Sequence, residues 1–172
     1  QRPSDLGYSD EGYDLPPFDV IYHEVTSDHT KAGFDRDGQG SMFVDAALSL
    51  RDASKEKRSS LELRVDKMRE IVEADPESAY IFWHDLEDER HAIQTAIPSA
   101  VSIYGTQDLD EREQAIIDFS DGKFKYLSTK PEISGSGCNF QRHCNWAIFL
   151  GIGFKFNDFI QACHRINRFQ QT

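Results

Sequence analysis

The sequence lacks a long hydrophobic run. No window approaches about 18 consecutive apolar residues, so no membrane-spanning helix is predicted. The first residues carry neither the basic stretch nor the apolar segment of a secretory signal, and we expect them to be an internal part of a longer protein. Cysteine is scarce, with three in 172 residues. This odd, sparse set, without a secretory signal, predicts a protein of the reducing cytoplasm. The lack of a long apolar run predicts that a membrane is not a partner.

The signatures of several enzyme classes are absent as well. The sequence has no G-x-x-x-x-G-K-[ST] phosphate loop, no G-x-S-x-G nucleophile turn and no H-E-x-x-H zinc pair. Zinc is the less favoured interpretation of the cysteines and neighbouring histidines, because structural zinc sites usually show paired ligands two to four residues apart. Ordinary core thiols explain these residues better, and we predict no metal site: Cys138, His143, Cys144, Cys163, His164.

Charge is unevenly divided along the chain. The net charge is -11, which disfavours non-specific binding to nucleic acid. Residues 1–122 hold 12 Lys/Arg against 28 Asp/Glu, whereas residues 123–172 hold 7 against 2, so the last segment has a net charge of +5 on an acidic body. Such a segment suits a phosphate group, of a nucleotide or of a nucleic acid. A chance cluster of surface lysines is the alternative.

Hydrophobic periodicity predicts an alternation of strands and helices. Strands are predicted over 18–25, 79–84, 100–105, 123–129 and 145–151, and helices over 42–59, 61–75, 85–97, 108–122 and 156–169. Residues 1–17 are predicted to be a linker or arm, and 26–41 a loop. Alternation with short connections indicates an α/β fold of three layers, in which helices cover both faces of a mostly parallel central sheet.

The carboxyl ends of parallel strands are where such sheets bind ligands. This rule selects the segments that follow His84, Gly105, Thr129 and Gly151. His84 comes directly after a predicted strand, so it is a candidate for ligand contact. A residue at the mouth of a loop without any ligand is the alternative interpretation.

Two further groups of residues suit a phosphate. Gly135 and Gly137 flank a serine shortly after a predicted strand, with Asn139 behind them. Glycines let the backbone approach phosphate oxygens closely, although many such pairs are simple turns. In the last predicted helix, Gln161 is followed at i+4 and i+7 by Arg165 and Arg168, which predicts one shared face. Two guanidinium groups on one face favour an anion between them, and a solvated basic helix end is the alternative.

These motifs resemble those of superfamily-two helicases, most closely the Swi/Snf-like and phage-type members. Motif VI of that family reads Gln, three residues, Arg, two residues, Arg, two residues, Gln, and the present chain matches it from Gln161 to Gln171. The glycine pair with Asn139 resembles motif V, and the strand that ends at His84 resembles motif IV. His164 stands where the family often has glycine before the first arginine, and Gln170 stands where Swi/Snf proteins often have glycine, so the resemblance leaves the subfamily open.

The resemblance covers roughly residues 60–172 and implies the second RecA-like domain of an ATP-dependent DNA helicase or translocase. It implies that Arg165 and Arg168 act as arginine fingers on the phosphates of ATP. ATP and Mg²⁺ would be bound mainly by a first RecA-like domain outside this chain. The implied nucleotide contacts are Gly135, Gly137, Asn139 and Gln161, and the implied DNA contacts are Ser128, Thr129, Lys130 and His84. Residues 18–60 would be a connection or subfamily insertion packed on the domain, and the chain alone would hydrolyse no ATP.

Two other functions remain open at this point. A non-enzymatic module could use the basic segment to dock nucleic acid or a protein. A Rossmann-type transferase could place a cofactor on the glycine turn, although its glycines would follow the first strand rather than a late one.

Overall fold

The computed structural model describes residues 3–9, 11, 15–25, 57–58, 60–134, 139–153 and 155–168. A short 3-10 helix, η1, covers Pro3–Leu6. The main body runs through α2 (Leu61–Ala74), β1 (Tyr80–Trp83), α3 (Glu87–Ala96), β2 (Val101–Ser102), α4 (Leu109–Ser120), β3 (Tyr126–Thr129), β4 (Trp146–Phe149) and α5 (Phe156–Cys163). The strands form one sheet in the order β2-β3-β1-β4, and every pair is parallel. The predicted α/β fold with a parallel sheet is therefore confirmed.

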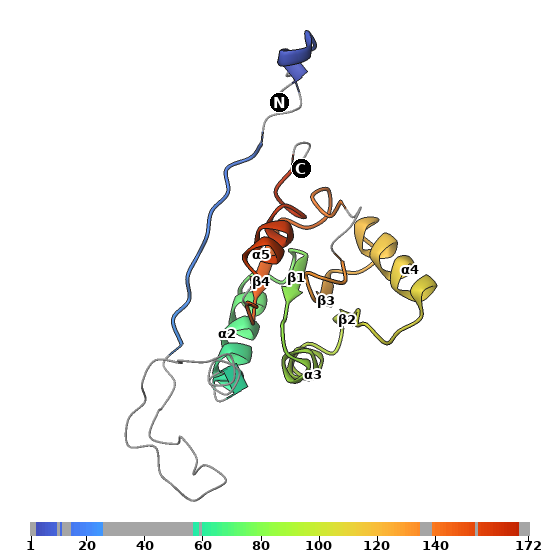
Figure 1. The fold of residues 1–172 in the computed structure, drawn as a ribbon. Coiled ribbons are helices and arrows are strands. Elements are labelled where there is room, and N and C mark those ends of the chain that lie inside the picture. The colour runs from blue at the N-terminus through green and yellow to red at the C-terminus, as the bar shows by residue number, and fades with distance from the viewer. Residues whose placement is uncertain are drawn as a thin grey trace, which may run out of the picture.

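Alternate residues of β1 build two separate cores, because successive side chains of a strand point to opposite faces of the sheet. Ile81 and Trp83 pack in a cluster with Phe119 of α4 and with the α5 region. Tyr80 and Phe82 pack on the other face with residues of α2 and α3. Helices thus cover both faces, as the sequence predicts (Figure 1). All four β1 residues are at most 2% exposed, which explains why this strand is continuously apolar.

The ends of α4 follow from its sequence. Asp108 precedes the helix and its carboxylate accepts a hydrogen bond from the backbone N–H of Asp110 at 2.9 Å. Gly122 follows the helix with φ of +75°, and its N–H bonds to the carbonyl of Phe119 at 3.0 Å. A positive φ is typical of the glycine that ends a helix. The predicted stop at Gly122 is therefore confirmed.

The strand predicted over 18–25 is wrong. Residues 15–25 form neither helix nor strand, and Val20, Ile21 and Tyr22 are 48%, 61% and 87% exposed. An alternating pattern gives only the propensity for a strand, whereas a ladder also needs a neighbouring strand. This arm is tied to the body through Asn167 Nδ2, which donates to the carbonyl oxygen of Pro16 at 3.2 Å.

The last helix is shorter than predicted, since it ends at Cys163 rather than at 169. Beyond it, the N–H groups of Arg165 and Ile166 bond three residues back, which tightens the chain into a turn. The carbonyl of Arg165 also accepts from the N–H of Phe140 at 3.3 Å. The loop at Phe140 thus bonds to a carbonyl that would accept a backbone N–H of the same helix if α5 were longer. Most of the helix predicted over 42–59 lies outside the described residues, and the packing of 18–60 on the domain stays a prediction.

Candidate functional site

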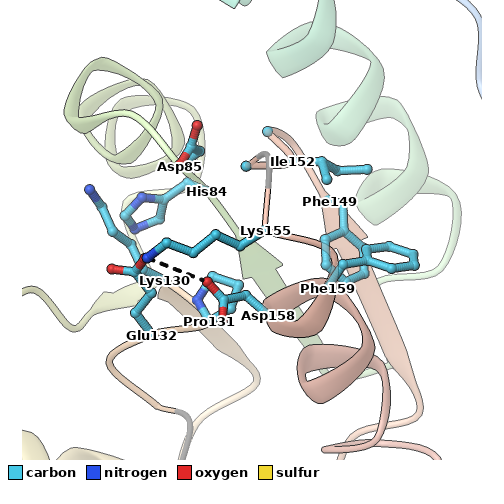
Figure 2. Close-up of a pocket in the computed structure, with 12 residues that line it drawn as sticks. His84, Asp85, Lys130, Pro131, Glu132, Phe149, Ile152, Lys155, Asp158 and Phe159 are labelled. Carbon is cyan, nitrogen blue, oxygen red and sulfur yellow. Dashed lines mark hydrogen bonds and ion pairs between the residues drawn. The ribbon is translucent and has the colours of Figure 1, made fainter. Parts of the chain in front are cut away.

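The carboxyl ends of β1, β3 and β4 meet at one edge of the sheet and enclose a cavity of about 290 Å³ (Figure 2). His84 follows β1, Lys130 follows β3, and the chain from Gly151 to Gly153 follows β4. The first turn of α5 closes the cavity with Lys155, Asp158 and Phe159. Three of the four loops selected from the sequence thus line one cavity, as the geometry of parallel sheets requires.

His84 lies deeper than the sequence suggests. Its side chain is 0% exposed, and neither ring nitrogen has a hydrogen-bond partner within the described part of the chain. Burial, and secondarily the nearby Lys130 ammonium, lower the pKa of His84 from 6.5 to about 4. The imidazole is therefore neutral at pH 7 and presents one N–H donor and one lone pair.

This burial makes stability depend on pH. The unfolded chain protonates His84 near pH 6.5 and the folded chain near pH 4, so the free energy of unfolding falls as the pH drops through this window. We expect a loss of about 2 kcal/mol between pH 7 and pH 5 that His84→Asn removes, measured as the difference between urea unfolding curves. The charges near the ring are Lys130, Arg90, Glu87 and Glu89, and the variant retains all of them. Equal pH dependence in both proteins would contradict this assignment.

Lys130 lies at this edge of the sheet without a carboxylate partner among the described residues. Other lysines of the basic segment are paired: Lys123 with Asp118 at 2.6 Å, Lys125 with Glu77 at 3.1 Å, and Lys155 with Glu132. Three of the seven Lys/Arg of the C-terminal segment are thus paired with carboxylates, whereas Lys130 remains available to an anion.

The two remaining candidates for nucleic-acid contact are buried. Ser128 and Thr129 are both 0% exposed. The Thr129 hydroxyl lies 2.9 Å from the Ser134 hydroxyl, while Ser128 Oγ has no hydrogen-bond partner among the described residues. Their side chains therefore support the strand and its loop, and their contact with nucleic acid stays a prediction.

A second cluster gathers residues of the two predicted phosphate motifs. The guanidinium of Arg168 donates a hydrogen bond to Oδ1 of Asn139. Asn139 directly follows the glycine turn, although Gly135 and Gly137 themselves lie outside the described residues. Two segments that are about thirty residues apart in the sequence thus meet at one place. This contact brings residues of the two predicted phosphate motifs together, and an anion bound between them stays a prediction.

The shared helical face predicted for Gln161, Arg165 and Arg168 is wrong, because the helix ends before the arginines. Gln161 is exposed on α5, Arg165 is only 6% exposed, and Arg168 is partly exposed. The two arginines therefore differ in access to solvent, and Arg168 is the one that can meet a ligand without rearrangement of the core.

A buried ion pair supports the cavity from behind. The Glu89 carboxylate is 0% exposed and accepts from Arg64 at 2.8 Å, from the N–H of Asp85 at 2.8 Å and from the N–H of Leu86 at 2.9 Å. Arg64 also donates to the carbonyl of Leu150. A Cβ on Gly151 would lie 2.2 Å from Glu89 Oε2, so only glycine fits there.

Sequence reasoning missed this support. Glu89 is simply one of three acidic residues in the first turn of α3, where the helix dipole already favours acids. Arg64 is one of several charges in the helical pattern of α2. The sequence holds no signal that pairs residues 25 positions apart.

The described residues contain no group of three or more His, Cys, Asp or Glu that could hold a metal ion. Cys144 and Cys163 are buried free thiols, and burial raises the pKa of Cys144 to about 12. None of the helices described is long and apolar enough to cross a membrane.

Comparison with known proteins identifies the fold class. No protein-family model and no curated protein matches the chain. Among solved structures, the C-terminal part of the Fun30 ATPase domain is similar with a TM-score of 0.56 and 17% identity, over 63% of this chain and 37% of that one. The chain thus has the α/β fold, with an all-parallel sheet, of RecA-like helicase domains.

Two RNA-related structures have the same fold. The RNA helicase Prp28 from Chaetomium thermophilum, bound to ADP, has a TM-score of 0.54 and 14% identity over 63% of this chain and 28% of that one. S. cerevisiae Dbp5 L327V, bound to RNA and ADP BeF3, has a TM-score of 0.51 and 17% identity over 62% and 28%. The chain therefore matches about a quarter to a third of the length of these proteins.

Proposed function

We propose that this chain is the second motor domain of an ATP-dependent DNA helicase or translocase. The observation that carries the proposal is the contact between Arg168 and Asn139, which joins the two phosphate motifs inside a RecA-like fold. A first RecA-like domain, which holds the phosphate loop, would bind most of ATP and Mg²⁺. This chain would add Arg168, Arg165 and Gln161 from one segment, and Gly135, Gly137 and Asn139 from the other.

The partly exposed guanidinium of Arg168 fits such a role chemically. A planar fork of N–H donors matches phosphate oxygens, and Asn139 fixes its orientation before any ligand arrives. When the two domains close, positive charge would reach the γ-phosphate as negative charge develops on its oxygens. Arg165 is buried, so in this proposal it positions the turn and contacts the nucleotide only in the closed state.

The carboxyl edge of the sheet would form part of the nucleic-acid track. Lys130 supplies a cation that no described carboxylate neutralises, and His84 lies beside it in the same cavity. The track would extend over the backbone at Ser128 and Thr129. RNA is bound in the Dbp5 structure, which supports nucleic acid as the ligand class, and the choice of DNA follows the sequence resemblance alone.

A salt titration tests the track. On a single strand, each phosphate contact adds about 0.7 to the magnitude of the slope of log K against log salt. Lys130→Ala is therefore expected to lower this slope by about 0.7 for single-stranded DNA. Lys123→Ala is the matched control, because Asp118 already pairs with that ammonium. Equal slopes in all three proteins would remove Lys130 from the track, and tight binding with an unusually steep slope in the isolated chain would favour a docking module.

A further inference from the structure

The cavity at the carboxyl edge has walls that suit a flat ring. Pro131, Phe149, Ile152 and Phe159 line it beside the polar groups (Figure 2). The rings of Phe149 and Phe159 pack 4.9 Å apart, and Phe149 also stacks on Trp83 at 6.3 Å. This wall is therefore fixed before any ligand arrives. The volume of the cavity, about 290 Å³, lies just below the range of small-molecule sites, which is about 300–1,000 Å³.

The imidazole of His84 selects between ligands. Buried polar atoms usually have partners, yet both ring nitrogens lack one among the described residues. A neutral imidazole offers one donor and one acceptor, whereas an ionised phosphate only accepts hydrogen bonds. A phosphate would therefore leave one nitrogen without a partner. The edge of a nucleobase carries both hydrogen-bond donors and acceptors, so it can pair with the N–H group and with the lone pair of the His84 imidazole.

Charge at the mouth of the cavity points the same way. Asp85 pairs with Lys57 at 2.6 Å, and Lys155 pairs with Glu132 and lies 3.9 Å from Asp158. These pairs leave the interior without excess positive charge, so the cavity itself does not favour an anion. Lys130 alone offers an unpaired ammonium among the described cations that line it. A ligand that matches this arrangement has an uncharged part, which enters the cavity, and one phosphate, which stays at the mouth of the cavity beside Lys130.

We propose that this cavity receives one unstacked base of a single-stranded nucleic acid, with its phosphate on Lys130. The base lies against Phe149 and Phe159, and its edge bonds to His84 after the side chains that cover the buried ring move aside. This inference rests on the proposed nucleic-acid track and goes beyond it, because a track that holds only backbone phosphates needs no cavity with aromatic walls. A free nucleotide shares the same chemistry, so the test must separate the two sources.

The test compares two oligonucleotides that have the same number of phosphates. One is an ordinary single-stranded DNA, and the other has abasic sites throughout its central part. Binding to the 172-residue chain is measured by fluorescence anisotropy at low salt. Stacking of one base on aromatic side chains changes affinity by about 5- to 150-fold. We expect the ordinary strand to bind tighter than the abasic strand by a factor in this range.

Variants locate the effect in the cavity. Phe159→Ala is expected to weaken the ordinary strand and leave the abasic strand unchanged, so the ratio of affinities approaches one. Ile152→Ala acts at the half-exposed rim and serves as a second variant with less risk to folding. Leu109→Ala, on α4 and 69% exposed, is the control that should keep the full ratio. A ratio that survives both cavity variants overturns the proposal.

The remaining outcomes are also decisive. Equal affinity for both strands in the unchanged chain overturns base insertion and leaves the proposed track intact. Absence of binding to either strand overturns both. A nucleoside monophosphate that shifts the ring ¹⁵N resonances of His84, while the ordinary strand does not, shows that the cavity takes a free nucleotide instead. Inorganic phosphate alone should leave these resonances unchanged, and an equal shift with phosphate would contradict recognition of a base.

Discussion

Replacing Arg168 with alanine is expected to lower ATP turnover by the proposed two-domain motor about 10³- to 10⁵-fold. The guanidinium is partly exposed and held by Asn139, so its removal deletes a positioned cation rather than part of the core. In the proposed motor the loss would fall on kcat, because the guanidinium would contact the γ-phosphate most strongly as charge develops on it. The measurement is steady-state ATP hydrolysis with saturating single-stranded DNA.

Two further variants sharpen this experiment. Arg168→Lys keeps the charge but loses the planar fork, so we expect turnover between those of the alanine variant and the unchanged protein. Arg69→Ala removes an exposed arginine of α2 and serves as the control for general loss of charge. DNA binding should be nearly the same in all three. Normal turnover in Arg168→Ala would remove the assignment of this residue as an arginine finger.

Arg165 is a poorer subject for the same test. It is only 6% exposed, and its carbonyl accepts from the N–H of Phe140. Truncation of a side chain this buried creates a cavity and lowers stability as well as any catalytic contribution. A stability measurement must therefore accompany any kinetic result at this position.

Truncation of Glu89 to alanine is expected to destabilise the domain by about 3–5 kcal/mol. The substitution leaves Arg64 without its buried carboxylate and deprives the N–H groups of Asp85 and Leu86 of their acceptor. Unpaired buried charges and donors are among the most costly changes in a protein interior. Urea unfolding followed by circular dichroism measures the difference. Glu73→Ala is the control, since that carboxylate is exposed and 3.8 Å from Arg69, and its midpoint should not change.

Gly151→Ala checks the same cluster from the opposite side. The new methyl group would overlap the Glu89 carboxylate, which Arg64 and two backbone N–H groups hold in place. Overpacking of this kind typically costs about 1–3 kcal/mol. If Glu89→Ala leaves the urea midpoint unchanged, or if Gly151→Ala is fully tolerated, the ion pair does not anchor the carboxyl edge.

The fold was largely predictable because its signals are local. The apolar run of β1, the periodicity of α2 and the glycine after α4 each depend on residues that are close in sequence, and the structure confirms all three. The arm at 18–25 has the same strand propensity, yet it lacks a neighbouring strand among the described residues. Strand propensity is a property of the segment's own residues, whereas a strand forms only where a neighbouring strand is available for pairing.

The candidate site was less predictable, for a related reason. The order of the strands places His84 and Lys130 together, so the rule for parallel sheets finds the cavity. The helix predicted through Arg168 instead ends at Cys163, where the N–H groups of Arg165 and Ile166 bond three residues back and the Arg165 carbonyl accepts from the N–H of Phe140. The ion pair between Arg64 and Glu89 joins two helices, and no sequence pattern within either helix predicts it.

Helix α5 links the cavity at the carboxyl edge of the sheet to the turn that contains Arg168. Its eight residues form a strut of about 12 Å. Lys155, just before the strut, and Phe159 within it touch the cavity, whereas the turn beyond its far end leads to Arg168. In the proposed motor, α5 therefore connects a nucleotide unit seated at one end with the turn that carries the Arg168 guanidinium at the other, and a tilt of the helix would displace both.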